Sequence, residues 1–208
     1  MSQFRKGVNH FPTRKPELSA PQSILIAGPN GSGKSTCAKL LLPSTITFIN
    51  ADMIAQELTG HSGTAADLRA GRILLNRLSK LEADHKDFAL ETTLATVMLA
   101  SRIKRLKQKG YEVHLIFLWL PSDELAVERV ATRIRAGGHP VPVTTIKRRF
   151  VSGVKNFFEI YRPIVNSWRI YDNSKISEPE LIAHGSTNQT HTVHQSCLWN
   201  KIERKTVS

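Results

Sequence analysis

The sequence predicts an α/β protein in which a parallel sheet of five strands lies between layers of helices. The first supporting observation is a complete G-x-x-x-x-G-K-[ST] phosphate-binding loop at residues 28–35, set between an apolar run and a helical segment. The second is a regular alternation of strand-like and helix-like segments that continues to residue 172. Strands joined by helices pair in parallel through right-handed crossovers, so the sequence predicts a three-layer sandwich of the P-loop NTPase class.

The phosphate-binding loop reads Gly-Pro-Asn-Gly-Ser-Gly-Lys-Ser and follows a strand predicted at 23–27. Its glycines allow successive backbone N–H groups to turn toward phosphate oxygens at the start of the helix predicted at 36–42. In such loops the lysine, here Lys34, reaches the β- and γ-phosphates, and the hydroxyl of Ser35 holds Mg²⁺. An ordinary glycine turn is the alternative, and the flanking strand and helix argue against it. The chain is therefore expected to bind a nucleoside triphosphate.

The elements after the loop are predicted from hydrophobic spacing and from turn residues. Leucines and isoleucines recur at helical spacing in one long segment, Gly110 and the Gly137-Gly138 pair end two further helices, and the segment 112–119 is apolar enough to be buried on both faces. Strands are expected at 46–50, 88–90, 112–119 and 168–172, and helices at 64–81, 97–109, 122–135 and 144–161. Beyond residue 173 the pattern weakens: 181–183 and 192–194 can form short strands, and 197–204 a short helix.

A chain of 208 residues is expected to form one domain with tails. Three prolines and scattered charges predict a flexible arm over residues 1–22. The phosphate-loop domain is predicted over 23–175, and residues 176–208 are expected to form an extension that packs on the same domain.

Composition narrows the classes of function. With 40% hydrophobic and 22% charged residues the chain resembles a soluble globular protein, and its apolar stretches are too short to span a membrane. Its two cysteines, Cys37 and Cys197, have no metal-ligand spacing and suit a reducing cytoplasm. The net charge of +12 favours polyanions, either nucleotides or nucleic acid. Nucleic acid is the less favoured partner because no RNA-binding aromatic motif, zinc finger or clear helix-turn-helix is present.

Polar residues follow two of the predicted strands, and ligands of open α/β sheets bind beyond the carboxyl ends of strands. Asp52 comes two residues after the strand at 46–50, where a carboxylate can accept the proton of an attacking hydroxyl, help to hold Mg²⁺ through water, or cap a helix. Glu91, Thr92 and Thr93 follow the strand at 88–90. Glu91 can be a metal-associated acid, can bind a substrate hydroxyl with the two threonines, or can cap the next segment.

Arginines are dense between residues 129 and 149. Phosphoryl transfer spreads negative charge over the γ-phosphate oxygens, so a mobile flap that carries arginines can stabilise that charge and exclude water. The alternative is a solvated basic helix. We expect at least two members of this set to touch phosphate: Arg129, Arg133, Arg135, Arg148 and Arg149.

In these residues the sequence resembles the zeta toxin family of phosphate-loop kinases. The resemblance covers roughly residues 23–175. It rests on the loop at 28–36, Ile49-Asn50-Ala51-Asp52, Glu91-Thr92-Thr93, the segments 115–120 and 129–135, the Gly-Gly-His-Pro-Val-Pro turn, Asn156-Phe157-Phe158 and Tyr171-Asp172-Asn173-Ser174.

The resemblance implies a nucleoside-monophosphate-kinase-like fold and ATP-dependent phosphorylation of a sugar hydroxyl on UDP-N-acetylglucosamine. It implies that Asp52 is the general base, that Glu91, Thr92 and Thr93 bind substrate, and that two arginines clamp the γ-phosphate, with Arg135 and Arg148 as first choices and Arg133 next. The family's toxins can have an antitoxin protein as partner. The ATP-binding residues would be Gly28, Pro29, Asn30, Gly31, Ser32, Gly33, Lys34, Ser35 and Thr36, with Mg²⁺ on Ser35.

Two alternative functions stay open at this point. A kinase for another small hydroxyl compound would use the same base and the same clamp. A basic ATP-regulated nucleic-acid-binding protein, from a different functional class, would explain the charge and would bind with an affinity that falls steeply with salt. The base contacts that select a purine lie in variable loops, so ATP is the default nucleotide.

Overall fold

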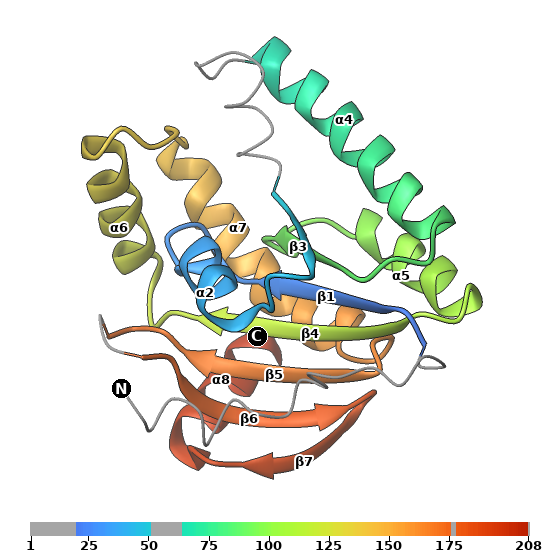
Figure 1. Ribbon diagram of the computed structural model, residues 1–208. Helices are drawn as coiled ribbons and strands as arrows, with labels where there is room; N and C mark the ends of the chain where they lie inside the picture. Colours follow the sequence, from blue (N-terminus) through green and yellow to red (C-terminus); the bar gives the residue numbers. More distant parts are fainter. Residues whose placement is uncertain (1–19, 51–63, 176–177, 208) are drawn as a thin grey trace.

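The computed structural model describes residues 20–50, 64–175 and 178–207 (Figure 1). Most of the predicted arm at 1–22, and Asp52, lie outside these residues. The elements are β1 (Gln22–Ala27), α2 (Lys34–Leu41), β2 (Thr47–Ile49), α4 (Thr64–Ala83), β3 (Phe88–Thr92), α5 (Met98–Gln108), β4 (Glu112–Trp119), α6 (Asp123–Arg135), α7 (Val143–Asn156), the π-helix η1 (Phe157–Tyr161), β5 (Ser167–Asp172), β6 (Glu180–Ser186), β7 (Gln189–Val193) and α8 (Ser196–Val207).

The sheet confirms the α/β class and corrects the predicted strand count. In the described residues the strand order is β2-β3-β1-β4-β5-β6-β7, and the five strands from β2 to β5 pair in parallel as expected. The prediction of a five-stranded, wholly parallel sheet is wrong because β6 and β7 add antiparallel strands beside β5. Such strands need only short connections rather than crossover helices. The sequence pattern underestimated β7 because most of its side chains are exposed and polar.

Helices cover the two faces of the sheet unequally (Figure 1). The larger core lies on one face and receives apolar side chains from α4, α5, α7, η1 and α8. The smaller core lies on the opposite face, where Cys37 and Ala38 of α2 pack on β1 and β4. The C-terminal residues join the larger core, since Trp199 of α8 stacks on Trp168 of β5 with ring centroids 5.7 Å apart.

A buried ion pair ties α4 to α5. The Arg102 Nε donates to a carboxylate oxygen of Glu82, and Lys109 Nζ lies 3.4 Å from the other oxygen. Only 4% of the Glu82 side chain is exposed. The pair therefore lies in a medium that stabilises an unpaired charge poorly.

Replacing Glu82 by glutamine is expected to lower the free energy of unfolding by about 3 kcal/mol, because it leaves the Arg102 guanidinium buried without a counter-charge. Urea denaturation of the two proteins measures the change. Glu112→Gln is the matched control: this carboxylate is 51% exposed beside His114, and its loss is expected to cost less than about 1 kcal/mol. Equal losses of unfolding free energy in both variants would contradict the conclusion that Glu82 and Arg102 form a stabilising buried ion pair.

Of the helices within the described ranges, none combines the length and apolar character that a bilayer span requires.

Candidate active site

The phosphate-binding loop lies at the carboxyl end of β1, between β3 and β4. All three of its glycines have positive φ angles: 141° at Gly28, 77° at Gly31 and 82° at Gly33. A Cβ atom at Gly28 would lie 2.4 Å from the carbonyl oxygen of Leu118, and one at Gly33 would lie 2.6 Å from Nδ2 of Asn173. Both positions therefore require glycine, for conformation and for space. The loop runs directly into α2, whose N-terminal amides favour an anion.

Lys34, the first residue of α2, is buried in the loop that it follows. Its side chain is 6% exposed, and its Nζ donates to the carbonyl oxygen of Pro29 at 2.9 Å. The same Nζ lies 3.7 Å from Oε1 of Glu91. The structure thus holds the predicted phosphate-binding ammonium at the loop, against a carboxylate from the neighbouring strand.

Glu91 is the centre of a polar cluster at the loop. Ser35 Oγ donates to Oε2 of Glu91 at 2.7 Å, and Asn50 Nδ2 donates to the same oxygen at 2.6 Å. Asn50 Nδ2 also lies 3.4 Å from Ser35 Oγ. A hydroxyl and a carboxylate beside a phosphate cradle are the hard oxygen ligands that Mg²⁺ prefers. The structure therefore brings Ser35 and Glu91 together in an arrangement that can hold this metal near a triphosphate.

Asn50 is a member of this cluster to which the sequence alone assigns no role. It directly follows β2, and its side chain is buried. The signal that could have found it is position, because β2 ends at the same edge of the sheet as β1 and β3.

Thr92 and Thr93 lie at the end of β3, beside the phosphate loop. The register pairs Thr92 with Ala27, the residue before Gly28. Thr92 Oγ1 accepts a hydrogen bond from the backbone N–H of Leu94 at 3.1 Å. The two threonines are half-buried, so they remain candidates for contact with a second substrate.

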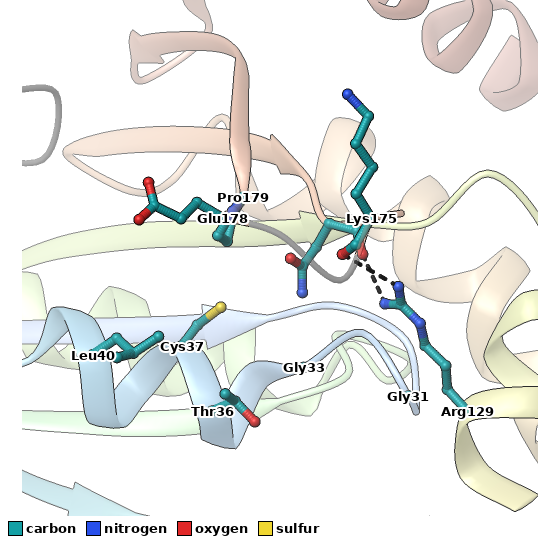
Figure 2. Close-up of a pocket in the computed structure, with 10 residues that line it drawn as sticks. Gly31, Gly33, Thr36, Cys37, Leu40, Arg129, Lys175, Glu178 and Pro179 are labelled. Atoms are coloured by element: carbon teal, nitrogen blue, oxygen red, sulfur yellow. Dashed lines mark hydrogen bonds between the residues drawn. The ribbon is translucent and has the colours of Figure 1, made fainter. Parts of the chain in front are cut away.

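A cavity of about 460 Å³ opens beside the loop (Figure 2). Its size lies within the range of pockets that hold drug-sized ligands. The lining comes from three segments. The phosphate loop and α2 contribute Gly31, Gly33, Thr36, Cys37 and Leu40, α6 contributes Arg129, and the chain after β5 contributes Asn173, Lys175, Glu178 and Pro179. Because the cavity adjoins the phosphate cradle, it can accept the nucleoside half of a nucleotide. Burial raises the pKa of the Cys37 thiol to about 11, so this thiol stays protonated well above pH 7.

Arg129 of α6 hydrogen-bonds to the segment after β5 that lines this cavity (Figure 2). Its guanidinium donates to the carbonyl oxygens of Asn173 and Ser174, each at 2.7 Å. Asn173 Nδ2 in turn donates to the carbonyl oxygen of Ser32 at 2.7 Å. Arg129 therefore links α6 to the segment after β5 and, through Asn173, to the phosphate loop. From the sequence, Arg129 could either touch phosphate or lie on a solvated helix face. In the structure its guanidinium donates to backbone carbonyl oxygens instead.

The other arginines of the dense segment are placed differently. Arg133 donates to the carbonyl oxygen of His139 at 2.9 Å and braces the turn after α6. Arg135 is exposed and donates to Thr132 Oγ1 at 3.0 Å. Arg148 is exposed on α7. Arg149, its neighbour, reaches the phosphate loop, with Nη1 3.4 Å from Oδ1 of Asn30.

The sequence matches a family model described as Zeta toxin over residues 9–178. It is also 30% identical over 129 residues to an uncharacterised protein of Haemophilus influenzae, an alignment that covers 62% of this chain and 92% of that protein.

Solved structures of similar fold include a chain of the AvrRxo1-ORF1:AvrRxo1-ORF2 complex with sulphate ions, with a TM-score of 0.67 and 16% identity, which covers 91% of this chain and 65% of that chain. The same complex with ATP gives a TM-score of 0.66 and 18% identity, with the same coverage. The chain thus spans slightly less than two thirds of the AvrRxo1 chains it matches. A chain of the PezAT toxin–antitoxin system of Streptococcus pneumoniae has a TM-score of 0.58 and 18% identity, over 96% of this chain and 92% of that chain.

Proposed function

The chain belongs to the zeta toxin family of kinase-type phosphotransferases, and on that premise we propose that it transfers the γ-phosphate of ATP to a hydroxyl of a nucleotide sugar such as UDP-N-acetylglucosamine. One observation carries the proposal. A buried lysine, a serine hydroxyl and a carboxylate meet at a phosphate loop, and this loop is continuous with a cavity of about 460 Å³. This arrangement supports a triphosphate in the loop and the nucleoside beside α2.

Mg²⁺ is proposed to bind between Ser35 and Glu91. The ion would neutralise charge on the β- and γ-phosphates during transfer. The hydrogen bond between Ser35 Oγ and Glu91 Oε2, at 2.7 Å, brings the two oxygens together beside the phosphate loop, which supports this site. Asn50 Nδ2 donates a hydrogen bond to the Glu91 carboxylate, and this contact would orient the carboxylate toward the metal.

Glu91→Gln is expected to raise the Mg²⁺ concentration for half-maximal activity about tenfold, because an amide keeps the shape but loses the charge that attracts a cation. The KM for the acceptor should change less than about threefold. Activity measured at a series of Mg²⁺ concentrations tests this. A higher KM for the acceptor at an unchanged Mg²⁺ requirement would instead assign Glu91 to substrate binding, the role that the family resemblance implies.

The acceptor is proposed to bind at Thr92 and Thr93, with Asp52 as the base that takes the proton of its hydroxyl. Arg135 and Arg148, with Arg133 next, are the proposed clamp on the γ-phosphate. Arg149 is added to them because its guanidinium already lies at Asn30 of the phosphate loop. The packing of Leu120, Ala126, Val130 and Ile146 joins α6 to α7, so these arginines belong to one helical pair.

Arg149→Ala is expected to lower kcat by about 10²-fold, the loss typical of one group that stabilises transition-state charge. Arg148→Ala on the same helix is the matched variant, because both side chains carry the same charge and occupy adjacent positions. Steady-state kinetics with ATP and UDP-N-acetylglucosamine measure both. A wild-type kcat in Arg149→Ala would show that Arg149 is not part of the clamp on the γ-phosphate. A wild-type kcat in Arg148→Ala would show the same for Arg148.

ADP release in the presence of different acceptors tests the function. UDP-N-acetylglucosamine should stimulate ADP release, and free N-acetylglucosamine and other small hydroxyl compounds test the second kinase hypothesis. Stimulation by one of these compounds alone would keep the kinase and replace its substrate. Stimulation by nucleic acid alone, declining steeply with salt, would favour the polyanion binder. An antitoxin protein is a further proposed partner, supported by the toxin–antitoxin system among the similar structures.

A further inference from the structure

The segment between β3 and α5 has an unusual backbone. Leu94 has a φ angle of 54°, in the left-handed region that branched and bulky residues rarely adopt, and its side chain is 1% exposed. The segment directly follows Thr92 and Thr93, the residues proposed to bind the acceptor. A backbone held in an unfavourable conformation beside a binding site requires contacts from outside the segment.

Those contacts come from α7 and η1. Asn156 Nδ2 donates to the carbonyl oxygen of Leu94 at 2.6 Å, and the Tyr161 hydroxyl donates to the carbonyl oxygen of Thr96. Gly153 lies so close that a Cβ atom there would be 2.5 Å from the carbonyl oxygen of Thr93. Three residues of one continuous helical segment thus contact the carbonyls of residues 93, 94 and 96.

The π-helix explains how two of these residues face the same segment. Asn156 and Tyr161 are five residues apart, a spacing that turns them about 140° away from each other in an α-helix. A π-helix closes its hydrogen bonds from residue i to i+5, so that the same spacing completes about one turn. The backbone N–H of Arg162 donates to the carbonyl oxygen of Phe157 at 2.8 Å in this pattern. Such single turns are frequent at functional sites.

The turn is held in place by the core. Phe157 is fully buried, with its ring centroid 5.0 Å from Phe117 of β4 and 5.9 Å from Trp168 of β5. Tyr161 is also fully buried, and burial raises the pKa of its phenol to about 12, so that its hydroxyl keeps its proton and donates at neutral pH. Seven residues before Asn156 on the same helix, Arg149 reaches Asn30 of the phosphate loop. One helix therefore contacts both the phosphate loop and the segment after β3.

We propose that Asn156 and Tyr161 are positioning residues for acceptor binding. Through the π-turn they hold residues 94–96 in place and so aim Thr92 and Thr93 at the second substrate. The inference rests on the proposed function, since it assigns the acceptor to this end of β3, but the contacts themselves do not depend on which compound the acceptor is.

Substitutions at Asn156 separate the hydrogen bond from packing. Asn156→Ala removes the side chain, and Asn156→Asp keeps its shape but, when ionised, has no N–H to donate. Both variants are expected to raise the KM for UDP-N-acetylglucosamine about tenfold and to change the Kd for ATP less than twofold. Tyr161→Phe, which lacks only the hydroxyl, is expected to act in the same direction.

Asn166→Ala is the matched control. Asn166 Oδ1 accepts a hydrogen bond from the backbone N–H of Val113 at 3.0 Å, at the amino ends of β4 and β5 and therefore at the opposite edge of the sheet from the site. Like Asn156→Ala, this variant loses a hydrogen bond between a side-chain amide and the backbone. Its Tm is therefore expected to fall about as much as that of Asn156→Ala, while its KM for the acceptor stays at the wild-type value. A wild-type acceptor KM in Asn156→Ala and Asn156→Asp would overturn the proposal, as would equal shifts in all three variants.

Hydrogen exchange keeps the test independent of the acceptor. Backbone amides of residues 94–97 should exchange about tenfold faster in Asn156→Ala than in wild type, and at the wild-type rate in Asn166→Ala. If wild type transfers no phosphate to UDP-N-acetylglucosamine but this exchange pattern holds, the proposed acceptor is wrong and the positioning role stands. If exchange at 94–97 is unchanged, the positioning role is wrong, whatever the acceptor.

Discussion

Asp52→Asn is expected to lower kcat by about 10³-fold and to leave the Kd for ATP within about twofold of wild type. A general base contributes roughly 10²–10⁴-fold to a proton transfer, and asparagine keeps the shape of aspartate without its basicity. Asp52 lies outside the described residues and follows Asn50 by two positions in the sequence. Asn50 in turn bonds Glu91 at the phosphate loop.

The measurement pairs steady-state turnover with calorimetric ATP binding. Asp84→Asn, in the exposed turn after α4, is the matched control, and wild-type turnover is expected from it. Normal phosphate transfer by Asp52→Asn would show that the general-base assignment is wrong. A large loss of ATP affinity with normal kcat would instead place Asp52 with the metal and the phosphates.

Lys34→Ala is expected to lower kcat about 10³-fold, because it removes a buried cation that contacts the phosphates in the transition state. The Nζ of Lys34 lies 2.9 Å from the carbonyl oxygen of Pro29 and 3.7 Å from Oε1 of Glu91, at the phosphate loop.

Lys39→Ala is the control for this prediction. Lys39 lies on the same helix α2 and carries the same charge, but its side chain is exposed. The turnover of Lys39→Ala should match that of wild type, and Lys34→Ala should be nearly inactive. Thermal melting verifies that both variants are folded. Comparable activity in the two variants would mean that the loop does not bind the transferred phosphate.

The loop motif and the expected end of β3 were enough to predict that Glu91 lies beside the phosphate loop. The prediction for Asp52 falls outside the described residues. The loop glycines predict backbone N–H groups that turn toward a phosphate, and Gly28 and Gly33 have positive φ angles in the structure. The rule that ligands bind beyond the carboxyl ends of strands predicts that Glu91 lies near the loop, where it contacts Ser35 and Lys34. These features depend on local sequence and on strand direction, both of which a single sequence contains.

Features that depend on tertiary packing could not be predicted in this way. A run of arginines does not tell which of Arg148 and Arg149 faces the loop, because that depends on how Ile146, Gly153 and Val154 orient α7 against its neighbours. The cavity beside α2 combines three distant segments, so no local pattern marks Asn173 or Lys175 as part of it. The turn of π-helix at Phe157–Tyr161 depends on the aromatic core around Phe157, and the sequence predicted a continuous helix there.

Incubation of the purified protein with γ-labelled ATP, Mg²⁺ and UDP-N-acetylglucosamine, beside Lys34→Ala, tests the central claim most directly. The account predicts label on the sugar of the nucleotide sugar in wild type and none in the variant. Lys34-dependent ATP hydrolysis with no labelled sugar would contradict the proposed acceptor. Equal labelling by wild type and Lys34→Ala would contradict phosphoryl transfer at this loop.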